Sequence, residues 1–278
     1  MLYRFLWIFF IYAFLGWCTE VSYAALVTGK FVNRGFLNGP VCPVYGFGVV
    51  IVLAGLSPLE DNLLLLFLGS LVLTSALEWL TGFVLEKLFH QRWWDYSDQP
   101  FNLSGYVCLR FSVAWGFACL FVVKLLHPTV LLFIRLIPRP LGLALLVLLG
   151  GVMAVDLTAT VSSIVKLNRR LEQIDELAAR IKEASNEFGE NLAERVLDAA
   201  ERGAGWKEDM DELSFRLAER RAELADDLEE WHGAMQSLLD GQSFGHRRLL
   251  RAFPRLRSLD HRDTLERLRR RVEDRWKR

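Results

Sequence analysis

Long runs of apolar residues fill the first part of the chain, and their length predicts helices that cross a membrane. A membrane span needs about 20 mostly apolar residues, because the hydrocarbon core of a bilayer is about 30 Å thick. Five segments fit this description, the second of them short: 2–27, 44–56, 63–86, 106–126 and 141–165. The sequence therefore predicts an all-α, polytopic membrane protein with five transmembrane helices, and it excludes a simple soluble enzyme.

The rest of the chain has the pattern of a coiled coil. Apolar or small residues recur at alternating spacings of four and three, the a/d rhythm of packed helices. The positions are Leu167, Leu171, Ile174, Ala178, Ile181, Ser185 and Phe188, and then Met210, Leu213, Leu217, Leu224, Leu228, Trp231, Met235 and Leu238. Gly203-Ala204-Gly205 between the two sets predicts a break, and hence a helical hairpin. We divide the chain into a transmembrane domain, residues 1–165, and a cytoplasmic charged helical domain, residues 166–278.

Charge follows the same division. Residues 1–165 contain only nine of the 33 Lys and Arg and eight of the 33 Asp and Glu, so the zero net charge is a sum of unlike parts. Residues 241–278 hold 13 basic and five acidic side chains. This basic stretch predicts contact with anionic lipid headgroups or with the acidic hairpin. Nucleic acid is the less favoured partner, because no aromatic platform accompanies the arginines.

Basic residues at the ends of the spans predict the orientation. Seven lie in the first connection, the third connection and the start of the tail: Lys30, Arg34, Lys87, Arg92, Lys166, Arg169 and Arg170. Four lie on the other side: Arg4, Lys124, Arg135 and Arg139. Since basic residues collect on the cytoplasmic side, we expect the tail inside and the amino terminus outside.

Ionisable side chains inside the spans are candidates for function, because burying a charge in lipid is costly unless it is paired or faces water. Glu20, Glu78, Glu86, Asp156 and Arg110 belong to four different spans, and the orientation places all of them in the inner half of the membrane or at its edge. We therefore expect one polar cluster on a transport path. The alternative for Glu20, Glu86 and Arg110 is that they simply reach the membrane interface.

The connection between the first two spans is irregular. Residues 33–48 contain two prolines and four glycines, which cannot continue a regular helix. Irregular backbone at membrane depth survives only where protein covers it or where it lines a watery cavity. We expect either a re-entrant or broken helix beside the polar cluster, as in transporters, or an inner loop that caps the bundle. Asn33 and Arg34 are its candidate site residues.

The third connection supplies two more candidates, Asp95 and Asn102. Asp95 follows Trp93-Trp94 and precedes Tyr96-Ser97, and Asn102 lies just before the fourth span. Tryptophan and tyrosine are common at the headgroup level, so the aromatic residues alone indicate little. We expect Asp95 to cap a turn or to pair with Arg34 or Arg92.

Catalytic and cofactor motifs are missing from the sequence. It contains no GxxxxGK[ST], HExxH or GxSxG pattern, its histidines have no ligand-like spacing, and its four cysteines form no CxxC pair. We therefore expect no enzyme, no metal site and no cofactor, and in particular no ATP hydrolysis by a P-loop of this chain.

Several of these motifs are also linked in a known family. They are Gly16-Trp17 with Glu20, Asn33-Arg34-Gly35-Phe36-Leu37 with Gly39-Pro40, Pro43, Tyr45-Gly46, Glu78 with Gly82 and Glu86, Trp94-Asp95-Tyr96-Ser97, and Asn102-Leu103. With them the chain resembles, over about residues 1–165, the bacterial ABC-transporter type IV permease family of the CmpB type. The resemblance implies a multi-pass protein of the bacterial cytoplasmic membrane that forms the membrane part of a transporter. It also implies a separate ATPase subunit and, since five helices make a small permease, a homo-oligomer.

Three functions remain in view. The first is a transport permease with the inner polar cluster on its path. The second is an ion- or proton-coupled carrier that uses Glu78 and Asp156. The third is a membrane scaffold or sensor that recruits partners through its coiled tail. An intramembrane enzyme has the least support, because no nucleophile–base pair is visible.

Overall fold

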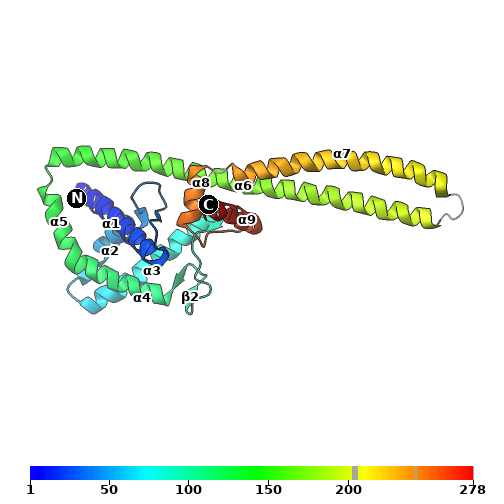
Figure 1. Cartoon of the computed structure of the whole chain (residues 1–278). Helices are drawn as coiled ribbons and strands as arrows, with labels where there is room; N and C mark the ends of the chain where they lie inside the picture. Colours follow the sequence, from blue (N-terminus) through cyan, green and yellow to red (C-terminus); the bar gives the residue numbers. More distant parts are fainter. Residues whose placement is uncertain (202–205, 242, 278) are drawn as a thin grey trace. The chain divides into compact units, whose positions relative to one another are not determined.

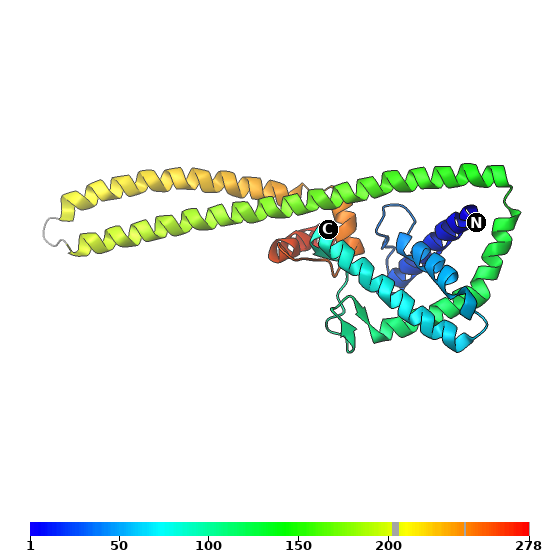
Figure 2. The same cartoon turned by 180° about the vertical axis from the view of Figure 1, so that it is seen from behind.

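The structure, a computed structural model, describes residues 1–201, 206–241 and 243–277, and it confirms the predicted all-α class (Figures 1 and 2). The predicted break at Gly203-Ala204-Gly205 lies outside the described residues. The helices are α1 (Leu2–Thr28), α2 (Pro43–Leu56), η1 (Ser57–Leu59), α3 (Leu63–Phe89), α4 (Leu109–Phe121), η2 (Val122–Leu126), α5 (His127–Leu136), α6 (Arg139–Glu201), α7 (Trp206–Asp240), α8 (Phe244–Ala252) and α9 (Arg262–Lys277). The strands are β1 (Gln91–Arg92), β2 (Asn102–Leu103), β3 (Val107–Cys108) and β4 (Arg257–Ser258).

The chain forms two compact units, which are described separately. Unit 1 consists of residues 1–166 and 244–262, and unit 2 of residues 167–243 and 263–278. The predicted boundary at residue 165 falls inside α6, which is one continuous helix of 63 residues. Residues 244–262 belong to the tail in sequence but pack with the apolar helices of unit 1.

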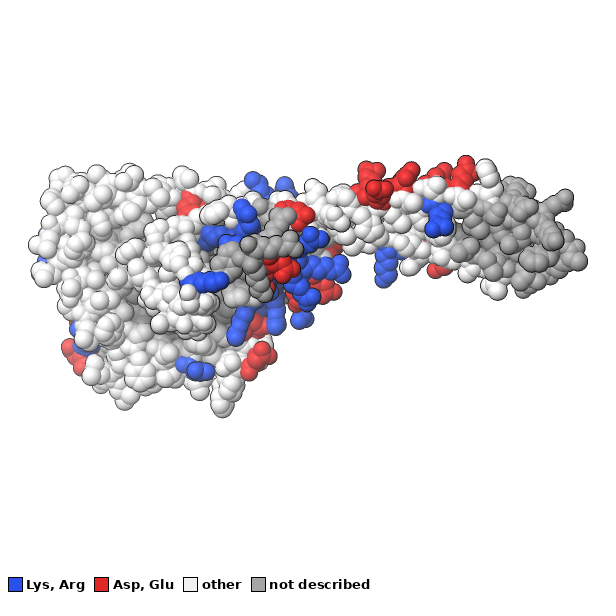
Figure 3. Space-filling model, in the orientation of Figure 1, with Lys and Arg blue, Asp and Glu red and all other residues white. Residues whose placement is uncertain are grey.

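Four helical segments are long and apolar enough to cross a membrane: Leu2–Thr28, Leu63–Phe89, Leu109–Leu136 and Arg139–Glu190. Few charged side chains are seen on the apolar part of unit 1 in the space-filling view (Figure 3). By contrast, α2 has 14 residues and rises about 21 Å, too little to cross the hydrocarbon core alone. The second predicted span therefore differs in kind from the other four.

The broken form of the second span is visible in its contacts with α1. The helix α1 ends at Gly29, whose φ of 69° lies in the left-handed region. The chain then folds back along α1 until the N–H of Cys42 donates to the carbonyl of Ala13, at 2.9 Å. Ala13 lies about 22 Å before the end of α1 at Thr28, given 1.5 Å per helical residue. An irregular stretch, residues 29–42, thus runs beside the C-terminal half of α1, and α2 continues beside the N-terminal half. We call these residues the first connection.

The fourth span ends later than the sequence pattern predicts. The expected end at Leu126 is wrong, because the helix continues through His127 and Pro128 to Leu136. Proline has no N–H to donate, and its ring crowds the preceding turn. A wide π-helical turn, Val122–Leu126, precedes Pro128 and accommodates it.

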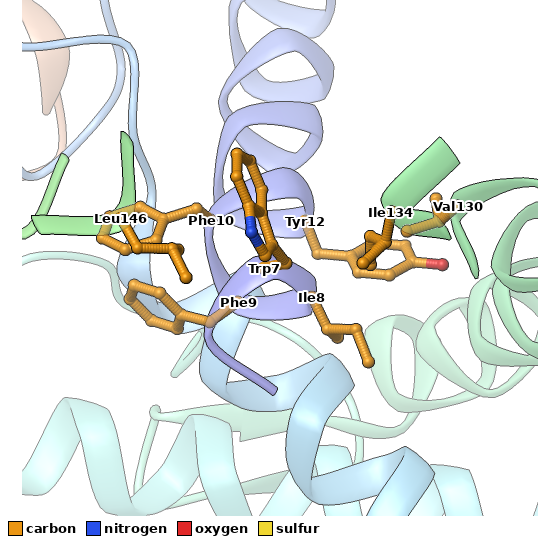
Figure 4. Packing of buried hydrophobic residues seen from close by; sticks show 8 residues of the cluster. All are labelled: Trp7, Ile8, Phe9, Phe10, Tyr12, Val130, Ile134 and Leu146. Carbon is orange, nitrogen blue, oxygen red and sulfur yellow. The ribbon is translucent and has the colours of Figure 1, made fainter. Parts of the chain in front are cut away.

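A cluster of apolar side chains fixes α1 among its neighbours. Its α1 members are Trp7, Ile8, Phe9, Phe10 and Tyr12, all at most 8% exposed, and the others are Val130 and Ile134 of α5 and Leu146 of α6. Tyr12 lies toward Val130 and Ile134, whereas Phe10 lies beside Leu146 (Figure 4). The first span is therefore a central helix of unit 1, contacted on separate sides by α5 and α6.

Unit 2 is a helical hairpin closed at its base by α9. The arms, α7 and the second half of α6, run side by side in both views (Figures 1 and 2). The predicted a/d residues Leu167, Leu171 and Ile174 are buried, whereas Ser185 is exposed. The side chains predicted at Met210, Leu213 and Leu217 lie outside the described residues. At the base, Arg271 pairs with Asp240 at 3.4 Å.

We expect a side chain at Gly16 to destabilise the protein. A Cβ built on Gly16 would lie 2.3 Å from Cγ of Tyr45, so Gly16→Ala forces α1 and α2 apart. Overpacking of this kind costs about 1–3 kcal/mol, which thermal unfolding in detergent would detect. Gly150→Ala is the matched control, because nothing lies within 4 Å of its Cβ. Equal unfolding temperatures for the two variants would contradict the close approach of α1 and α2.

Candidate functional site

Glu20 contacts the start of the broken span. The hydroxyl of Tyr45, in the first turn of α2, donates to Oε1 of Glu20 at 2.6 Å. Nε of Arg34, in the first connection, lies 4.0 Å from Oε2 of the same carboxylate. The guanidinium of Arg34 also lies over the ring of Tyr23, 5.6 Å from its centroid. Glu20 is therefore a bonded and partly neutralised carboxylate on the first span.

Glu78, from α3, lies near the same group of aromatic hydroxyls. Its Oε2 is buried, and within the described part of the chain no hydrogen-bond donor reaches that atom. It interacts with Tyr96 of the third connection, where burial and then the negative charge of Glu78 raise the pKa of the phenol, with a smaller contribution from Glu20. The structure thus brings Glu20 and Glu78, from different helices, toward Tyr45 and Tyr96.

Asp156 has a different role, because both oxygens of its carboxylate already accept hydrogen bonds from the first connection. Oδ1 accepts from the backbone N–H of Asn38 at 3.0 Å and from the Asn38 side chain at 2.8 Å. Oδ2 accepts from the N–H of Gly39 at 2.7 Å. The hydroxyl of Thr160, one turn along α6, lies 3.4 Å from Oδ1. Asp156 anchors the first connection to α6, and so it has little capacity left to bind an ion.

Asn33 arranges the beginning of the first connection. Its Oδ1 accepts from Nε1 of Trp17 at 2.8 Å and from the N–H of Gly35 at 3.0 Å. Its Nδ2 donates to the carbonyl of Asn38 at 2.7 Å. One amide side chain therefore joins α1 to both ends of a tight loop. This is a structural reason for the motif residues Trp17, Asn33, Gly35 and Asn38 to occur together.

A second charged group lies in the third connection, residues 90–108. Nε of Arg92 donates to Oε2 of Glu86 at 2.8 Å, and Nη1 of Arg92 lies 3.6 Å from Asp95. Nη1 of Arg257 donates to the other oxygen of Asp95 at 2.8 Å. Asp95 also accepts from the N–H and the hydroxyl of Ser97, at 3.0 and 2.6 Å. The predicted turn cap and the predicted pair with Arg92 are both confirmed, whereas Arg34 pairs with Glu20 instead.

The charge of Asp95 and the turn after it are both set by local bonds. Burial by itself would raise the pKa of Asp95, but the hydrogen bonds from Ser97 and the charges of Arg92 and Arg257 hold it below the usual value. Asn102 donates to the carbonyls of Ser97 and Gln99, at 3.2 and 2.8 Å. Asn102 therefore shapes the turn and has no contact with the acids of the spans.

The predicted single cluster separates into three groups in the structure. Glu20 and Glu78 form the first, Asp156 is the anchor of the first connection, and Glu86 belongs to the network of the third connection. Arg110 belongs to none of them: it is exposed and makes no hydrogen bond or ion pair with the residues described. Its predicted place in the cluster is wrong, because its side chain, on the first turn of α4, is exposed and pairs with none of the acids described.

Three residues of the site were not singled out from the sequence. Tyr45 and Tyr96 were noted only within motifs, although their hydroxyls contact the acids. Arg257 was assigned to lipid headgroups or the hairpin, but it pairs with Asp95, 162 residues away. A tyrosine two residues after the proline that begins a helix gives no sign of its partner, and one arginine in a basic tail cannot be told from its neighbours.

The fold and the site define a polytopic membrane protein whose second span is broken and whose acids Glu20 and Glu78 lie beside the break. The chain belongs to the family described as Putative ABC-transporter type IV, whose model matches residues 7–161. All nine candidate site residues named from the sequence fall within the matched range. No curated protein and no solved structure matches the chain. Among the residues described, no three His, Cys, Asp or Glu side chains lie together as a metal site would require.

We expect Asp156→Asn to loosen the first connection. An asparagine offers one acceptor oxygen in place of the carboxylate's two and no charge, so at least one of the N–H groups of Asn38 and Gly39 loses its partner. Hydrogen exchange of residues 33–42 should become faster by about tenfold or more, because local opening costs less. Ser163→Ala is the control, since that exposed hydroxyl bonds only within α6. Unchanged exchange in Asp156→Asn would show that the anchor is dispensable.

Proposed function

We propose that this protein is the membrane-embedded permease subunit of a transport system in the cytoplasmic membrane of a bacterium. Membership of the ABC-transporter type IV family supports the transport class. The observation that carries the proposal is the broken second span, in which an irregular stretch meets the half-helix α2 near the middle of α1. Transporters bind substrates at such interruptions, because unwound backbone and half-helix ends offer polar groups at membrane depth.

The two acids of the first group support a path beside this interruption. Glu20 lies eight residues before the end of α1, and Glu78 lies 11 residues before the end of α3. At 1.5 Å per residue these distances are about 12 and 16 Å, so both acids lie at a similar depth. Two carboxylates at a similar depth, on different helices and in contact with tyrosine hydroxyls, could bind a polar substrate or a cation that moves along a path beside the broken span.

The energy source in this proposal is a separate ATPase subunit on the cytoplasmic side. The chain carries no P-loop of its own, and we propose that it is not itself an enzyme. The count of basic residues favours a cytoplasmic tail and cytoplasmic first and third connections. The third connection offers a contact there, because Phe101 and Leu103, at β2, are 83% and 62% exposed.

The small size of the spanning part supports a homo-oligomer in contact with lipid. Four full spans and one broken span make a small permease. Large apolar side chains of α6 such as Val147 and Val155 are exposed in the single chain, at 76% and 72%. Lipid or a second copy would cover this surface, and nucleic acid has no place in the proposal.

Recovery of an ATPase with the tagged full-length chain tests this proposal. We expect quantitative mass spectrometry after purification in mild detergent to identify a P-loop ATPase with the wild-type protein. Phe101→Ser combined with Leu103→Ser should lower its recovery by about fivefold or more, because exposed apolar anchors carry much of an interface's binding energy. Leu136→Ser, an exposed position at the other end of the fourth span, is the control. Failure to recover any ATPase, with transport intact in cells lacking every candidate ATPase, would reject ATP-driven coupling.

A second candidate function, an ion- or proton-coupled carrier, is favoured by the buried Oε2 of Glu78, which no donor within the described residues reaches. It predicts proton flux in ATP-free liposomes under an imposed pH gradient, followed with a pH-sensitive dye. Glu78→Gln removes the titratable group and should reduce this flux by about tenfold or more. Glu60→Gln makes the same change at an exposed turn and should leave the flux unchanged. Full flux in Glu78→Gln would exclude this mechanism.

A further inference from the structure

The first connection is contacted by a segment from near the end of the chain. Residues 244–262 belong to unit 1, and α8 within them buries His246, Leu249, Leu250 and Ala252. Leu256, just after α8, is 1% exposed. This segment is therefore part of the packed structure around the connections.

Arg248 of α8 binds three successive carbonyl groups of the first connection. Its Nη1 donates to the carbonyls of Gly35 and Leu37, at 2.8 and 2.9 Å, and its Nη2 donates to that of Phe36 at 2.8 Å. A guanidinium suits this task because its donors form a rigid planar fork. Burial lowers the pKa of Arg248 while the charge of Asp156 raises it, and an arginine starts so high that it stays charged.

Two opposite charges thus hold consecutive peptide groups of one loop. Arg248 takes the carbonyls of residues 35–37, and Asp156 takes the N–H groups of Asn38 and Gly39. Asp156 belongs to a membrane-spanning helix and is fixed in place. Arg248 belongs to a short helix that the chain reaches only after the whole of residues 167–243. Of the two, Arg248 is the one whose helix could move without breaking a span.

The same segment is attached to the third connection. Strand β4 pairs with β1, so that Arg257 lies opposite Arg92 and Ser258 opposite Gln91. The ring of Phe253 meets that of Trp93 edge to face, at 4.7 Å between centroids. The N–H of Leu259 donates to the carbonyl of His90 at 3.0 Å. Residues 244–262 therefore join both connections, and we call them the strap.

We propose that Arg248 is a positioning residue which, as part of the strap, keeps the first connection closed over the break in the second span, and that the connection opens when Arg248 leaves its three carbonyls. This inference rests on the proposed function, because it concerns the segment beside the proposed path. Residues 167–243 connect the membrane-spanning part of α6 to the strap along the chain. A partner that binds the hairpin would therefore act on a segment that is continuous with the strap in the chain.

The thiol of Cys42 reports whether the first connection is closed. Cys42 ends this connection and is 5% exposed. In full-length protein whose other cysteines, Cys18, Cys108 and Cys119, are replaced by serine, the rate of labelling by N-ethylmaleimide measures opening around Cys42. We expect Arg248→Ala to raise this rate by about tenfold or more, because three buried carbonyls lose their donors. Arg247→Ala, at the exposed neighbouring position, should label at the rate of the unsubstituted background.

Chemical rescue separates positioning from general damage. Millimolar guanidinium chloride should return the labelling rate of Arg248→Ala toward that of the background, because the free ion can occupy the place of the missing side chain. The same concentration of sodium chloride should not. The proposal would be overturned if Arg248→Ala were labelled at the same rate as the protein that keeps Arg248. It would also be overturned if Arg248→Ala were labelled fast and guanidinium did not slow the labelling.

A milder variant covers the case in which Arg248→Ala does not fold. Arg248→Lys keeps the charge but lacks the fork that reaches three carbonyls, so we expect an intermediate labelling rate. Background labelling in Arg248→Lys would overturn the proposal in that case. Since labelling needs neither ATP nor a substrate, a failure of the strap and a failure of the permease assignment are read from different experiments.

Discussion

The constraint on which the structure depends is that an irregular backbone inside an apolar protein must have its peptide groups bonded. Residues 29–42 form no helix or strand, yet they fold back along α1 to the level of Ala13. Each free N–H or C=O in such a place costs several kcal/mol. Asn33, Asp156 and Arg248 supply the missing partners from the loop itself, from α6 and from α8. The broken span can exist because these three side chains replace the hydrogen bonds that a helix would make.

This requirement accounts for the different uses of charge in the protein. Asp156 and Arg248 bond to backbone groups of the first connection, and Glu86 and Asp95 are paired with Arg92 and, for Asp95, with Arg257. These charges stabilise the two connections. Glu20 and Glu78 lie beside the break with tyrosine hydroxyl groups as neighbours, and they are the acids that the proposed function assigns to the transport path. A charge within a span is therefore a structural anchor in one case and a site candidate in another.

Much of this arrangement could be predicted from local pattern. The lengths of the apolar runs gave the spans, the prolines and glycines of residues 33–48 indicated a broken helix, and Asp95 was expected at Arg92. The fourth span's end was missed because a π-helical turn tolerates Pro128, which a pattern scored on regular geometry does not allow. The sequence placed Arg110 in the polar cluster because its depth can be counted from its position along the span. Whether its side chain points toward the acids depends on how the helices pack, and the sequence does not show this.

The sequence by itself determined the class of protein, the four long apolar helices and the family, because hydrophobicity and short motifs are local properties. Only the tertiary structure decided which acid bonds to the backbone of the first connection and which acids lie beside tyrosine hydroxyl groups. It also decided that Arg248 meets residues 35–37 and that Arg257 meets Asp95. These partners are separated by more than 150 residues of chain, and the bonds between them exist only once α8 and β4 have packed against the connections. Composition and spacing carry no record of that packing.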